Sequence, residues 1–226
     1  MSKNVQNRIN ANIKRARELH AQFVAGINGR IAHQQAGIDA GIAGCDKVSP
    51  EWARALKWAT DDSEGTIRQI AALGRAFDFA NLCDVLPLTT KGARYVQAKT
   101  VEKCFKFVNA VFTQDPTRAT DYTVQVLYNA LHNGGELHID DVQASLTRKT
   151  SPTDTANLAT RGTYSKRTAG SQGSQVRMLA DVFKFAEVCK GKRDDVMRIK
   201  PELMGELREL FGVPETASAG DEGASE

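Results

Sequence analysis

Apolar and polar residues alternate along roughly the first thirty positions with the period of an α-helix. Apolar side chains recur at steps of three and four from Val5 to Ile27, and basic residues fall mostly between them. The pattern predicts a long helix with one apolar face and one cationic face. The apolar face needs a partner, either the core of the same chain or a second copy of it. Glycines at 37, 41 and 44 weaken helix propensity and indicate a loop.

The chain up to residue 115 continues as a helical region. Ser49, Pro50 and Glu51 have the order of a helix start: a capping serine, proline at the first position and an acid in the first turn. The pattern then predicts a helix from residue 50, a helix from 62 or 63 that includes Phe77, a short hairpin over 82–97 around Pro87, and a helix over 100–113 that ends before Asp115-Pro116.

From residue 121 the signals alternate between helix and strand. They predict a helix over 121–132, a short strand over 137–139, a short helix over 140–147, a helix over 175–187, a hairpin over 187–200 and a last helix over 201–211. Residues 147–175 hold almost no large apolar side chains and are rich in Ser, Thr, Gly, Lys and Arg. Such a composition is typical of a mobile segment.

These elements predict a mainly α fold with short β-hairpins. We expect a helical domain over 1–115, whose N-terminal helix could mediate oligomerisation, and a second domain over 121–212 with 147–175 inserted. The tail, 213–226, is too polar to fold. With 226 residues, 41% of them hydrophobic, the chain can bury a core without a disulfide or a metal ion.

The sequence carries no recognisable catalytic motif. Phosphate-binding and dinucleotide-binding glycine loops, a nucleophile elbow and a His-Glu-x-x-His pair are all missing from it. Three adjacent aspartate pairs begin at 61, 140 and 194; they could suggest a two-metal nuclease, but caps and turns also favour acids there. We expect no enzyme activity, no cofactor and no metal.

The cysteines and the apolar runs bear on the compartment. Cys45, Cys83, Cys104 and Cys189 lie far apart, and no histidine stands at zinc-ligand spacing from them, so we expect buried, reduced thiols. No run approaches the ~20 apolar residues that span a bilayer, and the polar, basic N-terminus lacks the apolar stretch of a secretory signal. Both features predict a cytoplasmic protein without a membrane anchor.

Charge is distributed unevenly, although the net charge is only +3. Residues 1–30 carry six basic residues and one acidic residue, residues 142–178 again carry six and one, and residues 213–226 carry four acids and no base, so the local balances are +5, +5 and −4. Mobile cations bind phosphate backbones, and an aromatic ring among them can stack on unpaired bases. The predicted nucleic-acid-binding residues are Lys14, Arg15, Arg148, Lys149, Arg161, Tyr164, Lys166, Arg167 and Arg177. A solvated surface loop would have the same composition.

Two phenylalanine pairs flank lysines and are further stacking candidates. Residues i and i+2 of a helix point in different directions, so at least one member of each pair should lie in the core. The pairs are Phe105 with Phe107, and Phe183 with Phe185.

The element order over 121–212 resembles a winged helix-turn-helix module, because the segment MLADVFKFAEVCKGKRDDVMRIKPE reads as a recognition helix that runs into a hairpin with a basic turn. The resemblance implies that Gln175, Arg177 and Lys184 point at base edges. It also implies that the wing residues, Lys190, Lys192 and Arg193, contact phosphate. The inserted segment 147–175 departs from the short turn that usually joins the two helices. A structural winged helix that mediates protein contacts is the alternative interpretation.

The basic body followed by an acidic tail resembles, in arrangement, the single-stranded DNA-binding proteins of bacteria and phages. Their tails recruit partners or compete with nucleic acid for the cationic groove; this tail lacks their terminal hydrophobic residues, and the body lacks their five-stranded barrel. The whole chain also looks like a small phage-encoded protein that supports replication or transcription in the host cytoplasm. The sequence therefore favours a non-catalytic, oligomeric single-stranded DNA-binding protein whose tail tunes the affinity or engages a polymerase. A winged-helix regulator that binds duplex DNA and a protein-interaction adaptor remain the alternatives.

Overall fold

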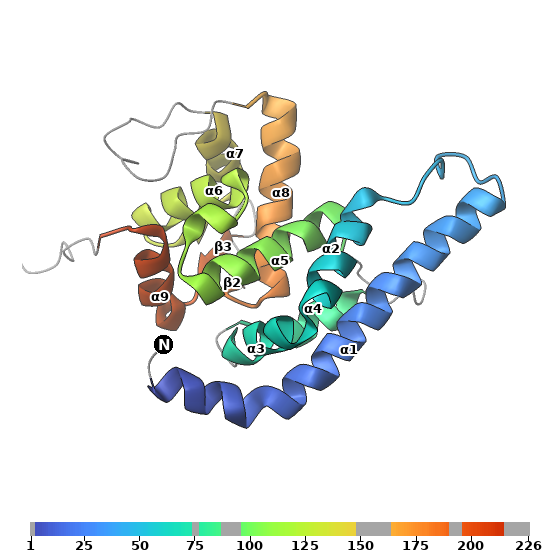
Figure 1. Cartoon of the computed structure of the whole chain (residues 1–226). Helices are drawn as coiled ribbons and strands as arrows, with labels where there is room; N and C mark the ends of the chain where they lie inside the picture. The colour runs from blue at the N-terminus through green and yellow to red at the C-terminus, as the bar shows by residue number, and fades with distance from the viewer. Residues whose placement is uncertain (1–2, 74–76, 87–95, 148–163, 190–195, 215–226) are drawn as a thin grey trace, which may run out of the picture.

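The computed structural model describes residues 3–73, 77–86, 96–147, 164–189 and 196–214 (Figure 1). It is mainly helical with one small antiparallel sheet, which confirms the predicted fold class. Outside these ranges lie residues 215–226 of the acidic tail and six of the predicted binding residues: Arg148, Lys149, Arg161, Lys190, Lys192 and Arg193. Val213, which we predicted to be part of the unfolded tail, is buried in the core.

Helix α1 (Lys3–Asp39) runs along one side of the molecule and packs on α2 (Pro50–Asp61) and α3 (Ser63–Leu73) (Figure 1). Its apolar face is buried from Ala16 to Ile27, so the chain's own core covers this part of the stripe. The helix continues past Gly37, where we predicted a loop. A Cβ at this position would lie 3.1 Å from Cys45 Sγ, so glycine allows the following segment to pack closely on the helix. The chain leaves the helix at Gly41, which has a φ of +65°.

The region that follows α3, up to residue 97, differs from the prediction. Helix α3 ends at Leu73, so Phe77 lies beyond it, although its side chain is buried. The hairpin predicted over 82–97 is wrong in its first part, because helix α4 (Phe79–Val85) occupies these positions. Its buried residues recur at helical spacing, and Asp78 caps it by accepting a hydrogen bond from Asn81 N at 2.9 Å. Residues 87–95 lie outside the described ranges.

Helix α5 (Ala98–Thr113) runs through the middle of the molecule and contacts helices on both sides (Figure 1). Phe107 lies 5.7 Å from Phe183 and 5.5 Å from both Phe185 and Phe77, ring centre to ring centre. Phe105 is also buried and stacks on Trp58. All four phenylalanines proposed as base-stacking candidates are therefore core residues, and that interpretation is wrong.

The C-terminal part follows the predicted order closely. Its elements are the 3-10 turn η1 (Pro116–Arg118), α6 (Asp121–His132), β1 (Glu136–Leu137), α7 (Ile139–Thr147), α8 (Lys166–Val182), β2 (Ala186–Cys189), β3 (Val196–Ile199) and α9 (Pro201–Phe211). The three strands are antiparallel in the order β1-β3-β2. Strand β1 is shorter than predicted, because α7 already begins at Ile139.

Helix α8 corrects two boundaries. It begins at Lys166, so residues 166–175, which we predicted as part of a mobile segment, are helical. It ends at Val182, and Ala186 already belongs to β2. The first turn of α8 has few apolar side chains but is capped by Ser165, whose hydroxyl accepts a hydrogen bond from Thr168 N at 3.2 Å. Local capping and tertiary packing replace the apolar periodicity that the sequence lacks.

Candidate nucleic-acid interface

Helices α7 and α8 pack closely because α8 presents glycines to α7. A Cβ on Gly173 would lie 2.5 Å from Val142 Cγ1, and one on Gly170 would lie 3.5 Å from Gln143 Nε2. Tyr164 N donates a hydrogen bond of 3.1 Å to the carbonyl oxygen of Leu146. This bond joins the end of α7 to the residue that precedes α8 by two positions. The close glycine packing and this hydrogen bond together hold α7 and α8 side by side where the segment between them, residues 148–163, begins and ends.

We define the basic junction as this closure together with Tyr164, Lys166 and Arg167. Both cations lie exposed in the first turn of α8, which contains no acidic residue. Neither has an ion pair with a carboxylate of the described residues. The positive end of the helix dipole adds to their charge. In the sequence, Arg148 and Lys149 follow α7 directly and Arg161 stands three positions before Tyr164, so the two flanks of the insertion are basic as well.

Tyr164 is half-buried rather than free to stack on a base. Its ring packs on that of Tyr122 with 4.6 Å between centres, and Tyr122 in turn lies 5.5 Å from the ammonium nitrogen of Lys103. Gln175 is 9% exposed, and its Oε1 accepts a hydrogen bond of 2.7 Å from Lys103 Nζ. The expectation that Gln175 points at base edges is therefore wrong, since its side chain is turned into the core.

Arg177 and Lys184 differ in their positions. Arg177 is half-buried on α8. Lys184 is exposed but follows the end of α8, in the turn before β2, where its backbone is left-handed with a φ of 52°. Its Nζ lies 3.2 Å from Asp181 Oδ1. This ion pair neutralises part of the charge that we assigned to DNA contact.

The N-terminal basic region is separate from the basic junction. Lys14 and Arg15 are exposed on α1, and Arg15 forms an ion pair of 3.1 Å with Glu18. Arg17 makes a two-pronged contact with Glu64 at 2.8 and 2.9 Å. The start of α1 and the start of α8 lie at opposite ends of the molecule in Figure 1. The two basic regions therefore do not form one continuous surface.

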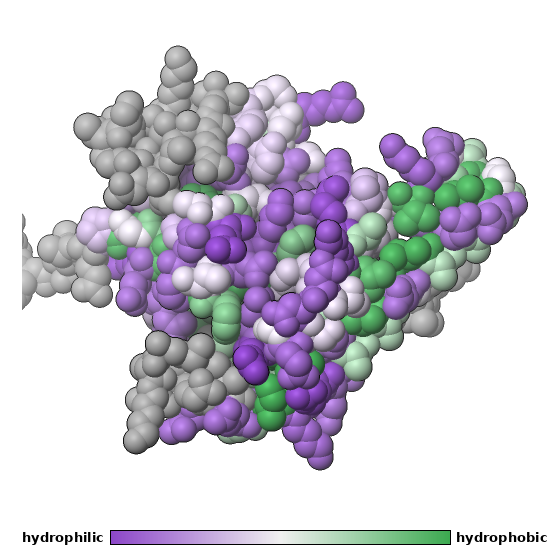
Figure 2. Space-filling model, viewed as in Figure 1, coloured by the Kyte–Doolittle hydropathy of each residue, from purple (hydrophilic) through white to green (hydrophobic). Residues whose placement is uncertain are grey.

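Hydrophobic side chains gather at the far end of α1 and in the segment that leads to α2, on the projecting arm at the right of Figure 2. Ile42, in that segment, is 57% exposed, and Ile38 and Val48 are half-buried. This apolar arm is distinct from the stripe that ends at Ile27.

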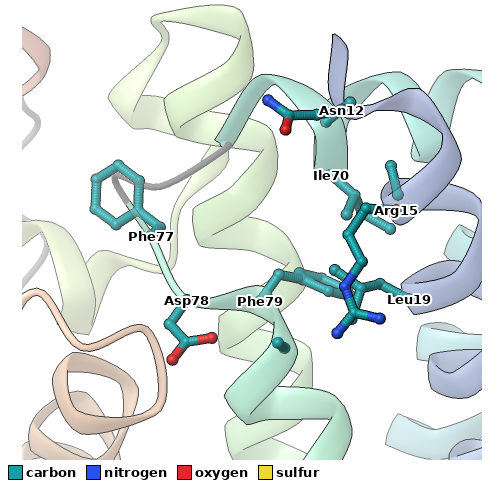
Figure 3. Close-up of a pocket in the computed structure, with 10 residues that line it drawn as sticks. Asn12, Arg15, Leu19, Ile70, Phe77, Asp78 and Phe79 are labelled. Atoms are coloured by element: carbon teal, nitrogen blue, oxygen red, sulfur yellow. The ribbon is translucent and has the colours of Figure 1, made fainter. Parts of the chain in front are cut away.

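A cavity of about 220 Å³ lies between α1, α3 and the segment before α4 (Figure 3). Its lining is mostly apolar: Leu19 and Ile70 lie beside the side chain of Arg15, and Phe79 lies between Arg15 and Asp78 (Figure 3). Asp78 is its only carboxylate, and it caps α4. Among the described residues of the lining, no pair of groups is suited to acid–base or nucleophilic catalysis.

Two of the four cysteines are fully buried thiols. Burial raises the pKa of Cys83 to about 12 and raises the pKa of Cys104 even further. The prediction of buried, free thiols is confirmed for both, whereas Cys45 and Cys189 are free but half-buried. Within the described ranges, no three His, Cys, Asp or Glu side chains are placed to hold a metal ion.

Sequence reasoning missed Lys103 and Tyr122. A signal for Lys103 was present, because Thr100, Phe107 and Ala110 share its face of α5 and all three are buried. A lysine on such a face should prompt a search for its partner.

None of the helices in the described part of the chain has the length and apolarity that a membrane crossing requires. Comparisons with protein-family models, with curated proteins and with solved structures found no match.

Proposed function

We propose that the chain is a non-catalytic nucleic-acid-binding protein whose α6-to-β3 unit binds duplex DNA as a winged helix-turn-helix does. The order α6-β1-α7-α8-β2-β3, with β3 in the middle of the sheet, supports this proposal. Helix α8 takes the place of the recognition helix. The observation that carries the proposal is the pair Lys166 and Arg167, exposed and without carboxylate partners among the described residues at the start of that helix.

The exposed surface of α8 suits close approach to a groove. Ser171 and Ser174 follow Arg167 at steps of four and three, so the three lie on one side of the helix, and all are exposed. The recognition helix of such modules contacts base edges through its N-terminal residues. Serine hydroxyls contact bases or phosphates, and the two cations contact phosphate. Arg148, Lys149 and Arg161 add further positive charges close in sequence to Lys166 and Arg167.

Single-stranded DNA is the second candidate. The aromatic pair of Tyr122 and Tyr164 at the basic junction favours it, because a ring beside cations is the usual platform for an unstacked base. The intramolecular contact between these rings already covers part of that platform. We therefore rank duplex DNA first.

Two secondary parts of the proposal concern the acidic tail and self-association. A tail of this charge could compete for the basic junction or engage a polymerase, as in the phage and bacterial proteins of similar layout. The stripe of α1 from Ala16 to Ile27 is buried in the chain's own core, so self-association would use another surface, and the exposed apolar arm is our candidate. The free cysteines fit a reducing cytoplasm.

The test is a fluorescence-anisotropy competition between duplex and single-stranded oligonucleotides of one sequence, over a range of salt concentrations. The double variant K166A/R167A should weaken duplex binding and reduce the slope of log K against log salt by about 1.8, or about 0.9 per lost phosphate contact. The variant K57A/R68A removes the same charge from exposed positions on α2 and α3 and is the matched control. If both variants lose the same affinity for duplex DNA, the loss reflects only the net charge of the protein, and the proposed site is refuted. Tighter binding of the single strand would favour the second candidate, and no binding at low salt would favour the adaptor.

A further inference from the structure

Lys103 lies in an unusual place for a lysine. It is 6% exposed on α5, and no carboxylate of the described residues lies within ion-pair distance of it. Its Nζ donates to Gln175 Oε1 on α8 at 2.7 Å and lies 5.5 Å from the centre of the Tyr122 ring on α6. A buried ammonium group that has only a neutral amide and an aromatic face as partners is costly.

The contacts continue from Lys103 to the base of the insertion. Tyr122 packs on Tyr164 with 4.6 Å between ring centres, and Tyr164 N bonds to Leu146 O. Lys103 thus contacts α8 directly through Gln175 and reaches the closure between α7 and α8 through two tyrosine rings. Lys166 follows Tyr164 by two residues, so the same contacts locate the cations of the basic junction.

The charge on Lys103 responds to pH within an accessible range. Burial lowers its pKa to about 8. Glu102 and the Cys104 thiol raise this pKa more weakly, whereas Lys106 and Lys99 lower it further, and all four lie on α5. The Glu102 carboxylate forms ion pairs with Arg54 Nη2 at 2.8 Å and with Lys106 Nζ at 3.1 Å. The facing groups on α6 and α8 are the uncharged Tyr122 and Gln175. About nine in ten molecules carry the ammonium at pH 7, and about one in ten at pH 9.

The two protonation states contact their surroundings differently. The ammonium is attracted by the face of the Tyr122 ring, whereas the neutral amine keeps a hydrogen bond to Gln175 but loses this attraction. Deprotonation therefore loosens the link from α5 to Tyr122 and Tyr164 while it removes the burial penalty. A residue kept at a cost to stability is typical of a functional site.

We propose that Lys103 is a positioning residue for the basic junction, and that its ammonium group, held between Gln175 and Tyr122, makes nucleic-acid binding there dependent on pH. The inference rests on the proposed function for its ligand. The coupling inside the protein is independent of that ligand and can be measured without it.

The first experiment uses the free protein. At pH 7, hydrogen exchange at the Tyr164 amide reports the closure, because this N–H bonds to Leu146 O. The variant K103M, similar in volume but never charged, should lower the protection factor about fivefold, and K103R, always charged, should keep it near the wild-type value. The control K106M removes a half-buried lysine of the same helix, which pairs with Glu102 instead of Gln175, and should leave the protection factor near the wild-type value. Unchanged protection in K103M would overturn the coupling.

The second experiment measures DNA affinity at constant salt between pH 7 and pH 9. Wild-type protein should lose about fivefold with a midpoint near pH 8. K106M should lose as much with a slightly higher midpoint, because Lys106 lowers the pKa of Lys103, whereas K103M should bind weakly at both pH values. A K103M protein with the wild-type affinity and pH profile would refute the inference and leave the proposed function intact. If wild-type protein binds no nucleic acid at pH 7, the proposed function fails, and the exchange experiment alone decides whether Lys103 positions the junction.

Discussion

Replacing Lys103 by methionine should stabilise the protein at neutral pH. The pKa of this lysine is about 8 in the folded chain, against an ordinary value of 10.5. Each unit of difference corresponds to 1.36 kcal/mol, so the buried ammonium costs about 3 kcal/mol at pH 7. Methionine removes this cost but leaves Gln175 Oε1 without its donor, which costs about 1–3 kcal/mol. The net expectation is a gain of about 0–2 kcal/mol.

The pH dependence of this gain is a sharper test than its size. Between about pH 8 and pH 10.5 the unfolded chain keeps the Lys103 proton that the folded chain has released, so the free energy of unfolding of wild-type protein rises with pH. Below pH 8 both states are protonated and the penalty is fully present. From pH 7 to pH 9 the advantage of K103M over wild type should therefore shrink by about 1 kcal/mol.

Two buried thiols act in the opposite direction. The raised pKa of Cys83 and of Cys104 means that the folded chain keeps protons which the unfolded chain loses above about pH 9. Wild-type stability alone should thus rise only slightly before it falls. These thiols are present in both proteins, so their contributions cancel in the difference between wild type and K103M.

The assay is urea unfolding of both proteins at pH 7, 8 and 9 with a reducing agent, at one protein concentration. Equal m-values would show that the comparison is one of stability and not of compactness. A loss of more than about 1 kcal/mol in K103M at pH 7 would refute the assigned burial cost. A difference that stays constant from pH 7 to pH 9 would refute the lowered pKa.

Three further predictions concern packing, capping and reactivity. The variant G173A should lose about 1–3 kcal/mol of stability in urea, because its Cβ would lie 2.5 Å from a valine methyl of α7, whereas G170A, with 3.5 Å available, should be neutral or slightly stabilising. Asp78→Ala removes the cap of α4 and should cost about 1 kcal/mol in thermal or urea unfolding, and Asp78→Asn should restore most of it. Native protein at pH 8 should take up iodoacetamide only at its two half-buried cysteines, since Cys83 and Cys104 are buried with raised pKa values; mass spectrometry should count four adducts after unfolding, and modification of all four in the native state would contradict the burial.

Elements with strong local signals were predictable from sequence. The Ser49-Pro50 start of α2 and the Asn133-Gly134-Gly135 end of α6 combine apolar periodicity with a boundary residue. Helix α2 begins at the predicted residue, and α6 has the predicted bounds. The hairpin of β2 and β3 was predicted for the same reason. The residues that start or stop these elements lie within a few positions of one another, so these elements can be predicted without knowledge of contacts between distant segments.

Elements without such signals required the tertiary structure. The first half of α8 has glycines and serines where a helix usually has apolar residues, and it forms because Gly173 packs on Val142 and Ser165 caps its start. Helix α4 lies where a proline and a turn signal further along pointed to a hairpin. In both cases a local cap, Ser165 or Asp78, acts together with burial against residues that are distant in sequence.

The candidate site divides in the same way. The sequence by itself determined how many charges the chain carries and where they cluster along it, including the basic residues around the insertion. Only the folded chain decided which of them remain available: Arg15 and Arg17 pair with carboxylates, Lys184 pairs with Asp181, and Lys166 and Arg167 stay exposed. It also turned Gln175 inward to Lys103. The physical reason is that charge and helix propensity are properties of residues and their neighbours, whereas burial and pairing depend on which distant segments the fold brings together.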